Sequence, residues 1–305
     1  MLAIKLCGLA LKNPLLLSSG ILDLTAPLMK KAYENGAAAV ITKGVGLKER
    51  QGHPNPTVIG TDKYLLNAVG LSNPSIFKFK NEIKELEKVN IPVIVNIFAE
   101  NAEKFAKTAL KAQEYGADAV ELNVSCPNIT KEEMVGQIIG KNPSLVEEIT
   151  RQVKETVKIP VIIKLTPNVD DIAMIAKAAE KGGADAVSAI NTISGMLINI
   201  EAKKPVLSNK FGGVSGPAIK PVAIASVYKI YEAVKIPIIG VGGITTGRDA
   251  IEMMMAGATA VAIGSAVYYR GIDVFRKIEN EMLQWMKENK VKSVKEIVGA
   301  AHGST

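Results

Sequence analysis

The sequence predicts an α/β protein built as a single (β/α)8 TIM barrel, and three observations lead to this prediction. Two phrases alternate along the 305 residues: Gly-Ala-x-Ala-Val, first at Gly36, and Ile-Pro-x-Ile, first at Ile91. Together with residues 13–20 they mark short apolar runs bounded by Gly or Pro, which is typical of strands buried on both faces of a parallel sheet. Amphipathic stretches such as 102–116 and 171–183 separate the runs and end on glycine, as helices do.

The eight expected strands follow one another at 13–20, 36–44, 91–98, 116–125, 159–166, 183–192, 236–243 and 257–265. No G-x-G-x-x-G follows the first of them, which disfavours a doubly wound dinucleotide-binding sheet. Residues 193–221 are too long for a plain connection and predict a protruding insertion after the sixth strand, either a hairpin or an interface element. The loop 128–142 is long enough to act as an active-site lid. No linker divides the chain, so we expect residues 1–305 to form one domain.

Composition argues against binding to nucleic acid or membranes. The net charge is +7, but the lysines alternate with acids in helical segments such as 79–88, and only 5% of residues are aromatic. This pattern is typical of a solvated surface rather than of a basic stripe with stacking platforms. The apolar start is broken by Lys5, Lys12 and Pro14 and has no features of a secretory signal. Two cysteines cannot make a disulfide framework, so we expect a cytoplasmic protein.

Polar residues gather where the expected strands end, which is where barrels of this type carry their chemistry. The small-residue turns at Gly242-Gly243 and Gly264-Ser265 follow the seventh and eighth strands, where such barrels often bind phosphate. The alternative is that these glycines only permit tight turns. The other polar strand ends are Ser18-Ser19-Gly20, Thr42-Lys43-Gly44, Asn96, Asn123 to Cys126, Lys164 to Thr166, and Asn191-Thr192.

The candidate for an acid–base or nucleophilic group is Cys126. Neither of the two histidines ends a strand, and no cluster has the ligand spacing of a metal site. Lys43 or Lys164 could lower the thiol pKa and favour the thiolate. The alternative is that Cys126 is a small buried residue, as most free cysteines are.

Amide side chains at the expected mouth suggest the kind of ligand. Asn67, Asn123, Asn128 and Asn191 offer both donors and acceptors, which suits a planar ring with alternating C=O and N–H groups. Each of them alone could be a turn or cap residue. Together they favour recognition of an imide-like ring.

The chain resembles the dihydroorotate dehydrogenase family, in particular its class 1B catalytic subunits, over nearly its whole length. The resemblance lies in Asn123-Val-Ser-Cys-Pro-Asn128, Asn67-Ala-Val-Gly-Leu71, Lys43-Gly44, Asn191-Thr192, Gly213-Val-Ser-Gly216 and Gly242-Gly243-Ile244. It implies an FMN-containing barrel that oxidises dihydroorotate to orotate in pyrimidine synthesis.

The resemblance also implies roles for individual residues. Cys126 matches the catalytic base of the family. The positions that match substrate contacts are Lys43, Asn67, Ala68, Val69, Gly70, Leu71, Asn123, Asn128, Asn191 and Thr192. The positions that match flavin contacts are Ser19, Lys43, Gly44, Asn96, Asn123, Lys164, Ile190, Gly216, Gly242, Gly243, Gly264 and Ser265. No metal is expected.

The resemblance implies a route for the electrons. An iron–sulfur cluster takes about four cysteine ligands, and this chain has two cysteines. Class 1B subunits pass electrons to a separate FAD and iron–sulfur subunit that reduces NAD, around a homodimer core of a heterotetramer. Three alternatives remain: a flavin barrel acting on another dihydropyrimidine such as dihydrouracil, a non-flavin phosphate-binding isomerase or synthase, and an idle scaffold.

Overall fold

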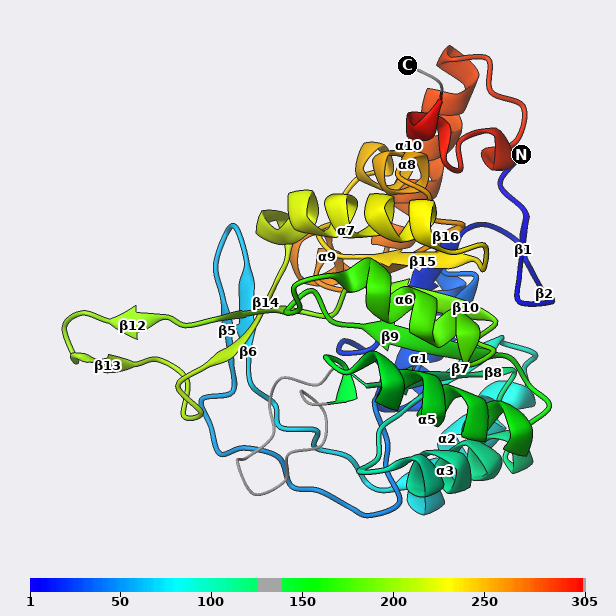
Figure 1. The fold of residues 1–305 in the computed structure, drawn as a ribbon. Helices are drawn as coiled ribbons and strands as arrows, with labels where there is room; N and C mark the ends of the chain where they lie inside the picture. Colours follow the sequence, from blue (N-terminus) through cyan, green and yellow to red (C-terminus); the bar gives the residue numbers. More distant parts are fainter. Residues whose placement is uncertain (125–138, 304–305) are drawn as a thin grey trace.

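A closed barrel of eight parallel strands forms the centre of the molecule in the computed structural model, which describes residues 1–124 and 139–303. Helices lie between successive strands around the barrel (Figure 1). In chain order, each strand pairs with the next and the last pairs with the first. The barrel strands are β3 (Leu15–Leu17), β4 (Ala39–Ile41), β7 (Val93–Ile97), β8 (Ala119–Asn123), β9 (Val161–Leu165), β10 (Ala186–Ala189), β15 (Ile238–Val241) and β16 (Ala260–Ile263). Each lies within one of the eight predicted runs, so the predicted fold class is confirmed.

The helices form the outer layer. They are α1 (Ala26–Glu34), α2 (Ile76–Glu87), α3 (Ala102–Glu114), α5 (Pro143–Thr156), α6 (Ile172–Lys181), α7 (Lys220–Ala233), α8 (Gly247–Met255), α9 (Ala266–Arg270) and α10 (Val274–Glu288). Of these, α3, α5, α6 and α8 begin at side-chain caps. Asn101, Asn142 and Asp171 each accept a hydrogen bond from a backbone N–H in the first turn of the helix that follows. Short 3₁₀ turns lie at Pro217–Ile219, Val294–Glu296 and Ala300–His302. The helices predicted within 102–116 and 171–183 are confirmed as α3 and α6.

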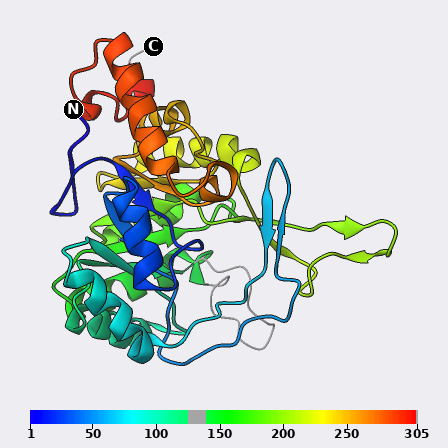
Figure 2. The same cartoon turned by 180° about the vertical axis from the view of Figure 1, so that it is seen from behind.

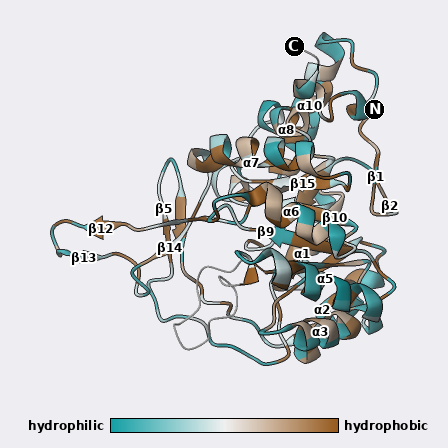
Figure 3. Ribbon diagram, in the orientation of Figure 1, coloured by the Kyte–Doolittle hydropathy of each residue, from teal (hydrophilic) through white to brown (hydrophobic). Residues whose placement is uncertain are grey.

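The core lies between the barrel and its helices. Strand residues such as Leu16, Val95 and Ile163 are fully buried, and so are Phe105 and Phe275 on the inner faces of α3 and α10. Figure 3 shows many hydrophilic residues along α2, α3 and α5. One apolar face per helix and two per strand is the pattern from which the barrel was predicted.

A second, antiparallel sheet lies beside the barrel mouth, and we call it the roof sheet. Its strands, in spatial order, are β11 (Ile193–Gly195), β14 (Gly212–Ser215), β6 (Leu65–Asn67) and β5 (Val58–Gly60). It joins the connection after β4 to the connection after β10, with Asn67 opposite Gly213. Between β11 and β14 the chain runs out as an arm that carries β12 (Ile198–Asn199) and β13 (Lys204–Pro205) (Figures 1 and 2). The predicted protruding insertion is therefore confirmed as a hairpin.

The opposite end of the barrel carries the N-terminal hairpin, β1 (Ile4–Leu6) and β2 (Leu9–Leu11). Leu6 and Leu11 belong to the main core, and the Cys7 thiol donates to the carbonyl of Asp185, just before β10 begins. The N-terminus lies beside the segment that follows α10, since the N–H of Val294 donates to the carbonyl of Met1 (Figure 1). Among the residues that the structure describes, no helix combines the length and the apolar character that crossing a membrane requires.

Candidate active site

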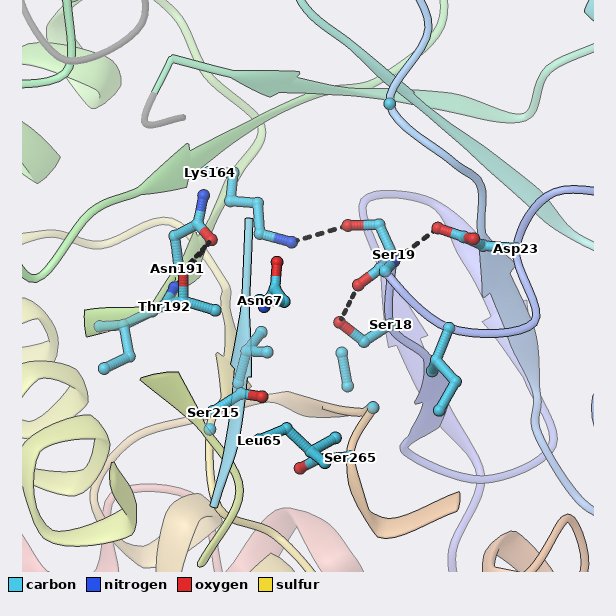
Figure 4. Close-up of a pocket in the computed structure, with 18 of the residues that line it drawn as sticks. Ser18, Ser19, Asp23, Leu65, Asn67, Lys164, Asn191, Thr192, Ser215 and Ser265 are labelled. Atoms are coloured by element: carbon cyan, nitrogen blue, oxygen red, sulfur yellow. Dashed lines mark hydrogen bonds between the residues drawn. The ribbon is translucent and has the colours of Figure 1, made fainter. Parts of the chain in front are cut away.

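A pocket opens at the carboxyl ends of the barrel strands, beneath the roof sheet. Its cavity volume is about 250 Å³. Figure 4 shows polar side chains from several strand ends converging on it. The residues that sequence analysis had placed here and that line the pocket are Ser19, Lys43, Gly44, Asn67, Val69, Gly70, Leu71, Asn96, Asn123, Lys164, Ile190, Asn191, Thr192, Gly216, Gly242, Gly243, Gly264 and Ser265.

Among the described residues, one predicted site residue, Ala68, does not line the pocket. Ala68 is fully buried in a small apolar cluster with Leu66 and Leu207. Its side chain therefore packs behind the roof sheet rather than facing a ligand. Cys126 and Asn128 lie outside the described residues, as does most of the predicted lid, 128–142.

The pocket floor is made of polar side chains from neighbouring strands. Lys164 on β9 points toward Ser19 at the end of β3, with its Nζ 2.9 Å from the serine Oγ (Figure 4). The same Nζ lies 3.5 Å from Oε1 of Glu121 on β8, whose side chain is fully buried. A buried ammonium held by a hydroxyl and a carboxylate is a fixed positive centre at the base of the pocket.

Asn96 on β7 presents an acceptor at the wall of the pocket. Its Nδ2 donates to Glu121, and its Oδ1 is buried with no hydrogen-bond partner among the described residues. Leaving such an oxygen unsatisfied costs about 1–3 kcal/mol, so it marks a place where a ligand donor would be gained. Gly44 is part of this arrangement, because a Cβ there would lie 2.8 Å from the Asn96 oxygen.

The turn after β15 is built from two glycines for a steric reason. Gly243 has φ +71°, and a Cβ there would lie 2.7 Å from the backbone nitrogen of Lys220. Gly242, also with positive φ, would place a Cβ 2.9 Å from Ala223. These glycines therefore allow the backbone after β15 to pack closely against α7. The turn lies at the position where barrels of this type often bind phosphate.

Asp249 in α8 holds the segment that follows this turn. Its Oδ2 accepts from the backbone N–H groups of Thr245 and Thr246 at 3.0 and 2.8 Å, and its Oδ1 accepts from Lys220 at 2.8 Å. Burial on its own would raise the pKa of Asp249, but the hydrogen bonds from Lys220 and the two threonines outweigh it and lower the pKa to about 2.

This shift predicts a pH dependence of stability. Because the folded-state pKa of Asp249 lies below its unfolded value, the carboxylate stabilises the fold above about pH 4 and ceases to do so as the pH falls toward 2. We expect Asp249→Asn to lower the free energy of unfolding at neutral pH by about 1–3 kcal/mol, with a smaller difference near pH 2. Urea unfolding at several pH values measures this. Asp171→Asn, which keeps a helix cap, is the control, and an equal loss at every pH would contradict the assignment.

The upper part of the pocket is formed by amides and the roof sheet. Nδ2 of Asn67 on β6 donates to the carbonyl of Gly213 at 3.2 Å, which ties it to β14. Asn191 Nδ2 lies 3.4 Å from Asn123 Oδ1, and Asn191 Oδ1 accepts from the N–H of Thr192 at 2.7 Å. These groups offer the donors and acceptors that were predicted to face an imide-like ring.

Sequence reasoning missed two buried carboxyl groups, Asp23 and Glu121. Asp23 lines the pocket and accepts from the N–H of Gly20. Burial raises the pKa of Asp23, against the opposing effect of Lys43. Glu121 could have been found, because it is the charged residue in the apolar run Ala119–Asn123. Asp23 follows a predicted strand end by three positions and has no comparable signal.

Cys7, the other cysteine of the sequence, lies away from the pocket, beside Asp185 at the start of β10. Burial, followed by the nearby Asp185 carboxylate, raises its pKa to about 12. At neutral pH roughly one molecule in 10⁵ would carry this thiolate. We expect an alkylating reagent to modify Cys126 and spare Cys7 in the native chain, as peptide mass spectrometry would show. The native Cys126→Ala variant should take up no label until it is unfolded, and label on Cys7 before unfolding would contradict its inert state.

Comparisons with known proteins agree with this architecture. The family model described as dihydroorotate dehydrogenase matches residues 1–286. The chain is 48% identical over 301 residues to the catalytic subunit of dihydroorotate dehydrogenase B (NAD(+)) from Pyrococcus abyssi, covering 99% of each chain. It is 47% identical over 306 residues to the protein of the same name from Methanocaldococcus jannaschii, covering 99% of this chain and 98% of the other.

A solved structure supports the fold. The dihydroorotate dehydrogenase of Eimeria tenella in complex with ferulenol superposes with a TM-score of 0.86 at 21% identity, covering 99% of this chain and 89% of that one. At this identity the likeness shows the barrel alone, whereas the archaeal sequences match over their full length. The chain belongs to the dihydroorotate dehydrogenase family.

Proposed function

We propose that this chain is the catalytic subunit of an FMN-dependent dihydroorotate dehydrogenase that oxidises dihydroorotate to orotate for pyrimidine synthesis. The observation that carries the proposal is the pocket, in which a buried ammonium, an unsatisfied acceptor and two glycine turns lie below a layer of amides. Relatives at 47–48% identity bear this enzyme's name over nearly the whole chain.

The lower part of the pocket fits FMN. The turns at Gly242-Gly243 and Gly264-Ser265 would hold the phosphate through backbone N–H groups. Asn96 would accept from the ring through its unpaired oxygen, and Lys164 would place positive charge beside it. The remaining positions proposed to hold the cofactor are Ser19, Lys43, Gly44, Asn123, Ile190 and Gly216.

The upper part would hold dihydroorotate. Lys43 would pair with its carboxylate, and Asn67, Asn123 and Asn191 would bind the ring amides, together with Val69 to Leu71, Thr192 and, by sequence, Asn128. Bound FMN supplies the acceptor for the hydride that leaves carbon 6.

The acid–base step is assigned to Cys126 by its sequence position just after β8. Its thiolate would remove the proton from carbon 5, and Lys43 or Lys164 would favour the ionised thiol. Lys164 would also stabilise the negative charge that reduction brings to the ring. Closure of the lid, 128–142, would exclude water from the thiolate.

The electron route is proposed from the relatives. Their names describe catalytic subunits of an enzyme that uses NAD(+). We infer that electrons leave this chain for an FAD and iron–sulfur subunit that reduces NAD, around a homodimer core of a heterotetramer in the cytoplasm.

An anaerobic absorption spectrum tests the proposal. The purified chain is expected to be yellow and to bleach when dihydroorotate is added. A yellow protein that responds to dihydrouracil but not to dihydroorotate would move the substrate to another dihydropyrimidine. A colourless protein that cannot be reconstituted with FMN would favour a phosphate-binding isomerase or synthase, and would overturn the oxidoreductase assignment.

A further inference from the structure

Four neighbouring barrel strands contribute one buried polar layer, which consists of Asn96 on β7, Glu121 on β8, Lys164 on β9 and Ser188 on β10. Asn96 is the register partner of Glu121, and Ser188 is the register partner of Lys164. Each of these residues is 5% exposed or less. Among them, Glu121 contacts all of the other three.

Glu121 is surrounded by donors. Asn96 Nδ2 donates to its Oε1 at 2.5 Å, Lys164 Nζ lies 3.5 Å from the same oxygen, and Ser188 Oγ donates to its Oε2 at 2.6 Å. Burying a carboxylate is costly unless donors satisfy it, and here an amide, an ammonium and a hydroxyl do so. The carboxylate is acceptor-only in this arrangement, so each neighbour must present a hydrogen to it.

This requirement fixes the orientation of the Asn96 amide. An amide has one oxygen and one NH₂ group, and the NH₂ must face Glu121. The oxygen is therefore left on the other side, where it has no partner among the described residues. Asn96 lines the pocket beside Gly44, where a Cβ would lie only 2.8 Å from the Asn96 oxygen and would compete with a ligand donor for it.

We propose that Glu121 is a positioning residue with two separable effects: its oxygen orients Asn96 as an acceptor for the ring N–H of the cofactor, and its charge partly offsets that of Lys164. This proposal rests on the proposed function, since the ligand concerned is FMN. Oxidised FMN has one ring N–H, at N3. The proposal therefore predicts a hydrogen bond from this N–H to the Asn96 oxygen.

Two substitutions separate the effects. Glu121→Gln keeps an oxygen that Asn96 and Lys164 can both donate to, while its NH₂ can donate to the Ser188 hydroxyl, so it removes the charge but keeps the orientation. Glu121→Met removes the acceptor and the charge together while filling a similar volume. Ser188→Ala is the matched control, because it removes one hydrogen bond from Glu121 and leaves both the charge and the contact with Asn96.

The first measurement is the affinity of the flavin-free protein for FMN and for 3-methyl-FMN. Binding is detected through the quenching of flavin fluorescence. The wild type is expected to prefer FMN by roughly 10- to 100-fold beyond any steric effect of the methyl group, because methylation removes the donor and leaves Asn96 unsatisfied. Glu121→Gln and Ser188→Ala should keep this preference. Glu121→Met should reduce it about tenfold, because Asn96 is then free to turn.

The second measurement is the reduction potential of bound FMN. Glu121→Gln should bind reduced FMN about tenfold more tightly relative to oxidised FMN than the wild type does. For a two-electron couple this corresponds to an increase of about 30 mV. Ser188→Ala should leave the potential unchanged, because it disturbs the buried layer but keeps the charge of Glu121. A change of potential in Glu121→Gln alone is therefore due to loss of the charge.

The outcomes separate this proposal from the one on which it rests. A wild type that binds neither flavin would overturn both. If the wild type binds FMN but Glu121→Met keeps the full preference for FMN over 3-methyl-FMN, the orienting role alone is overturned. If Glu121→Met does not fold, Asn96→Ala replaces it: loss of the preference supports the orienting role, and a retained preference overturns it. An unchanged potential in Glu121→Gln would overturn the role of the charge.

Discussion

Replacing Cys126 with alanine is expected to slow the reduction of bound flavin by dihydroorotate about 10²–10⁴-fold, the usual contribution of a positioned general base. The reason is that the proton on carbon 5 would lose its acceptor, while the groups proposed to hold FMN stay in place. Stopped-flow absorption at the flavin band measures the single-turnover rate without any need for an electron acceptor. The variant should therefore remain yellow and bleach slowly.

Cys7→Ala is the matched control for this experiment. Cys7 lies beside Asp185 at the start of β10, away from the pocket, and burial raises its pKa to about 12. Its loss should therefore leave the rate within a factor of about two. Cys126→Ser should regain rate as the pH rises, because a hydroxyl ionises far less readily than a thiol. A Cys126→Ala variant that reduces its flavin at the wild-type rate would show that the proton leaves by another route.

Lys164→Met is expected to slow the same reduction about 10²–10³-fold, the typical effect of removing one preorganised stabilising group from a site. The Nζ of Lys164 is buried between Ser19 and Glu121, so its charge is little screened by water. The rate of flavin reduction and the affinity for FMN are measured side by side. We expect the loss in rate to exceed the loss in affinity.

This substitution also leaves the Glu121 carboxylate without its cation, which costs about 3–5 kcal/mol when a buried pair is broken. The double variant Lys164→Met with Glu121→Gln removes that penalty and serves as the control for stability. If the double variant reduces its flavin as fast as the wild type, then Lys164 matters for folding and not for the reaction.

The barrel was predictable because its signal is local. Each strand is a short run of apolar residues with glycine or proline beside it, and each helix carries its own periodicity. The strand ends then follow from the fold, and this is why Asn96, Lys164 and Asn191 could be placed in the pocket from the sequence.

The roof sheet could not be predicted in the same way. Its strands are three or four residues long, and those of the arm are two residues long. The strand β6 pairs with β14, and the bonded residues Asn67 and Gly213 are 146 positions apart in the sequence. Such pairing depends on where the barrel brings two loops together. Neither loop has a periodic pattern of apolar residues that would predict the pairing. The sequence likewise has no signal that Asp23 faces the pocket. A motif does not say which of its side chains face inward, and the side chain of Ala68 packs with Leu66 and Leu207.

The position of the roof sheet over the pocket has a kinetic consequence. A ligand that lies below the sheet has to enter the pocket before a ligand that contacts the sheet. The residues proposed to hold FMN lie in the barrel floor and rim, and those proposed to hold dihydroorotate include Asn67 of the overlying roof sheet. In the proposed enzyme the flavin has to enter before the pyrimidine, and orotate has to depart before the flavin can exchange.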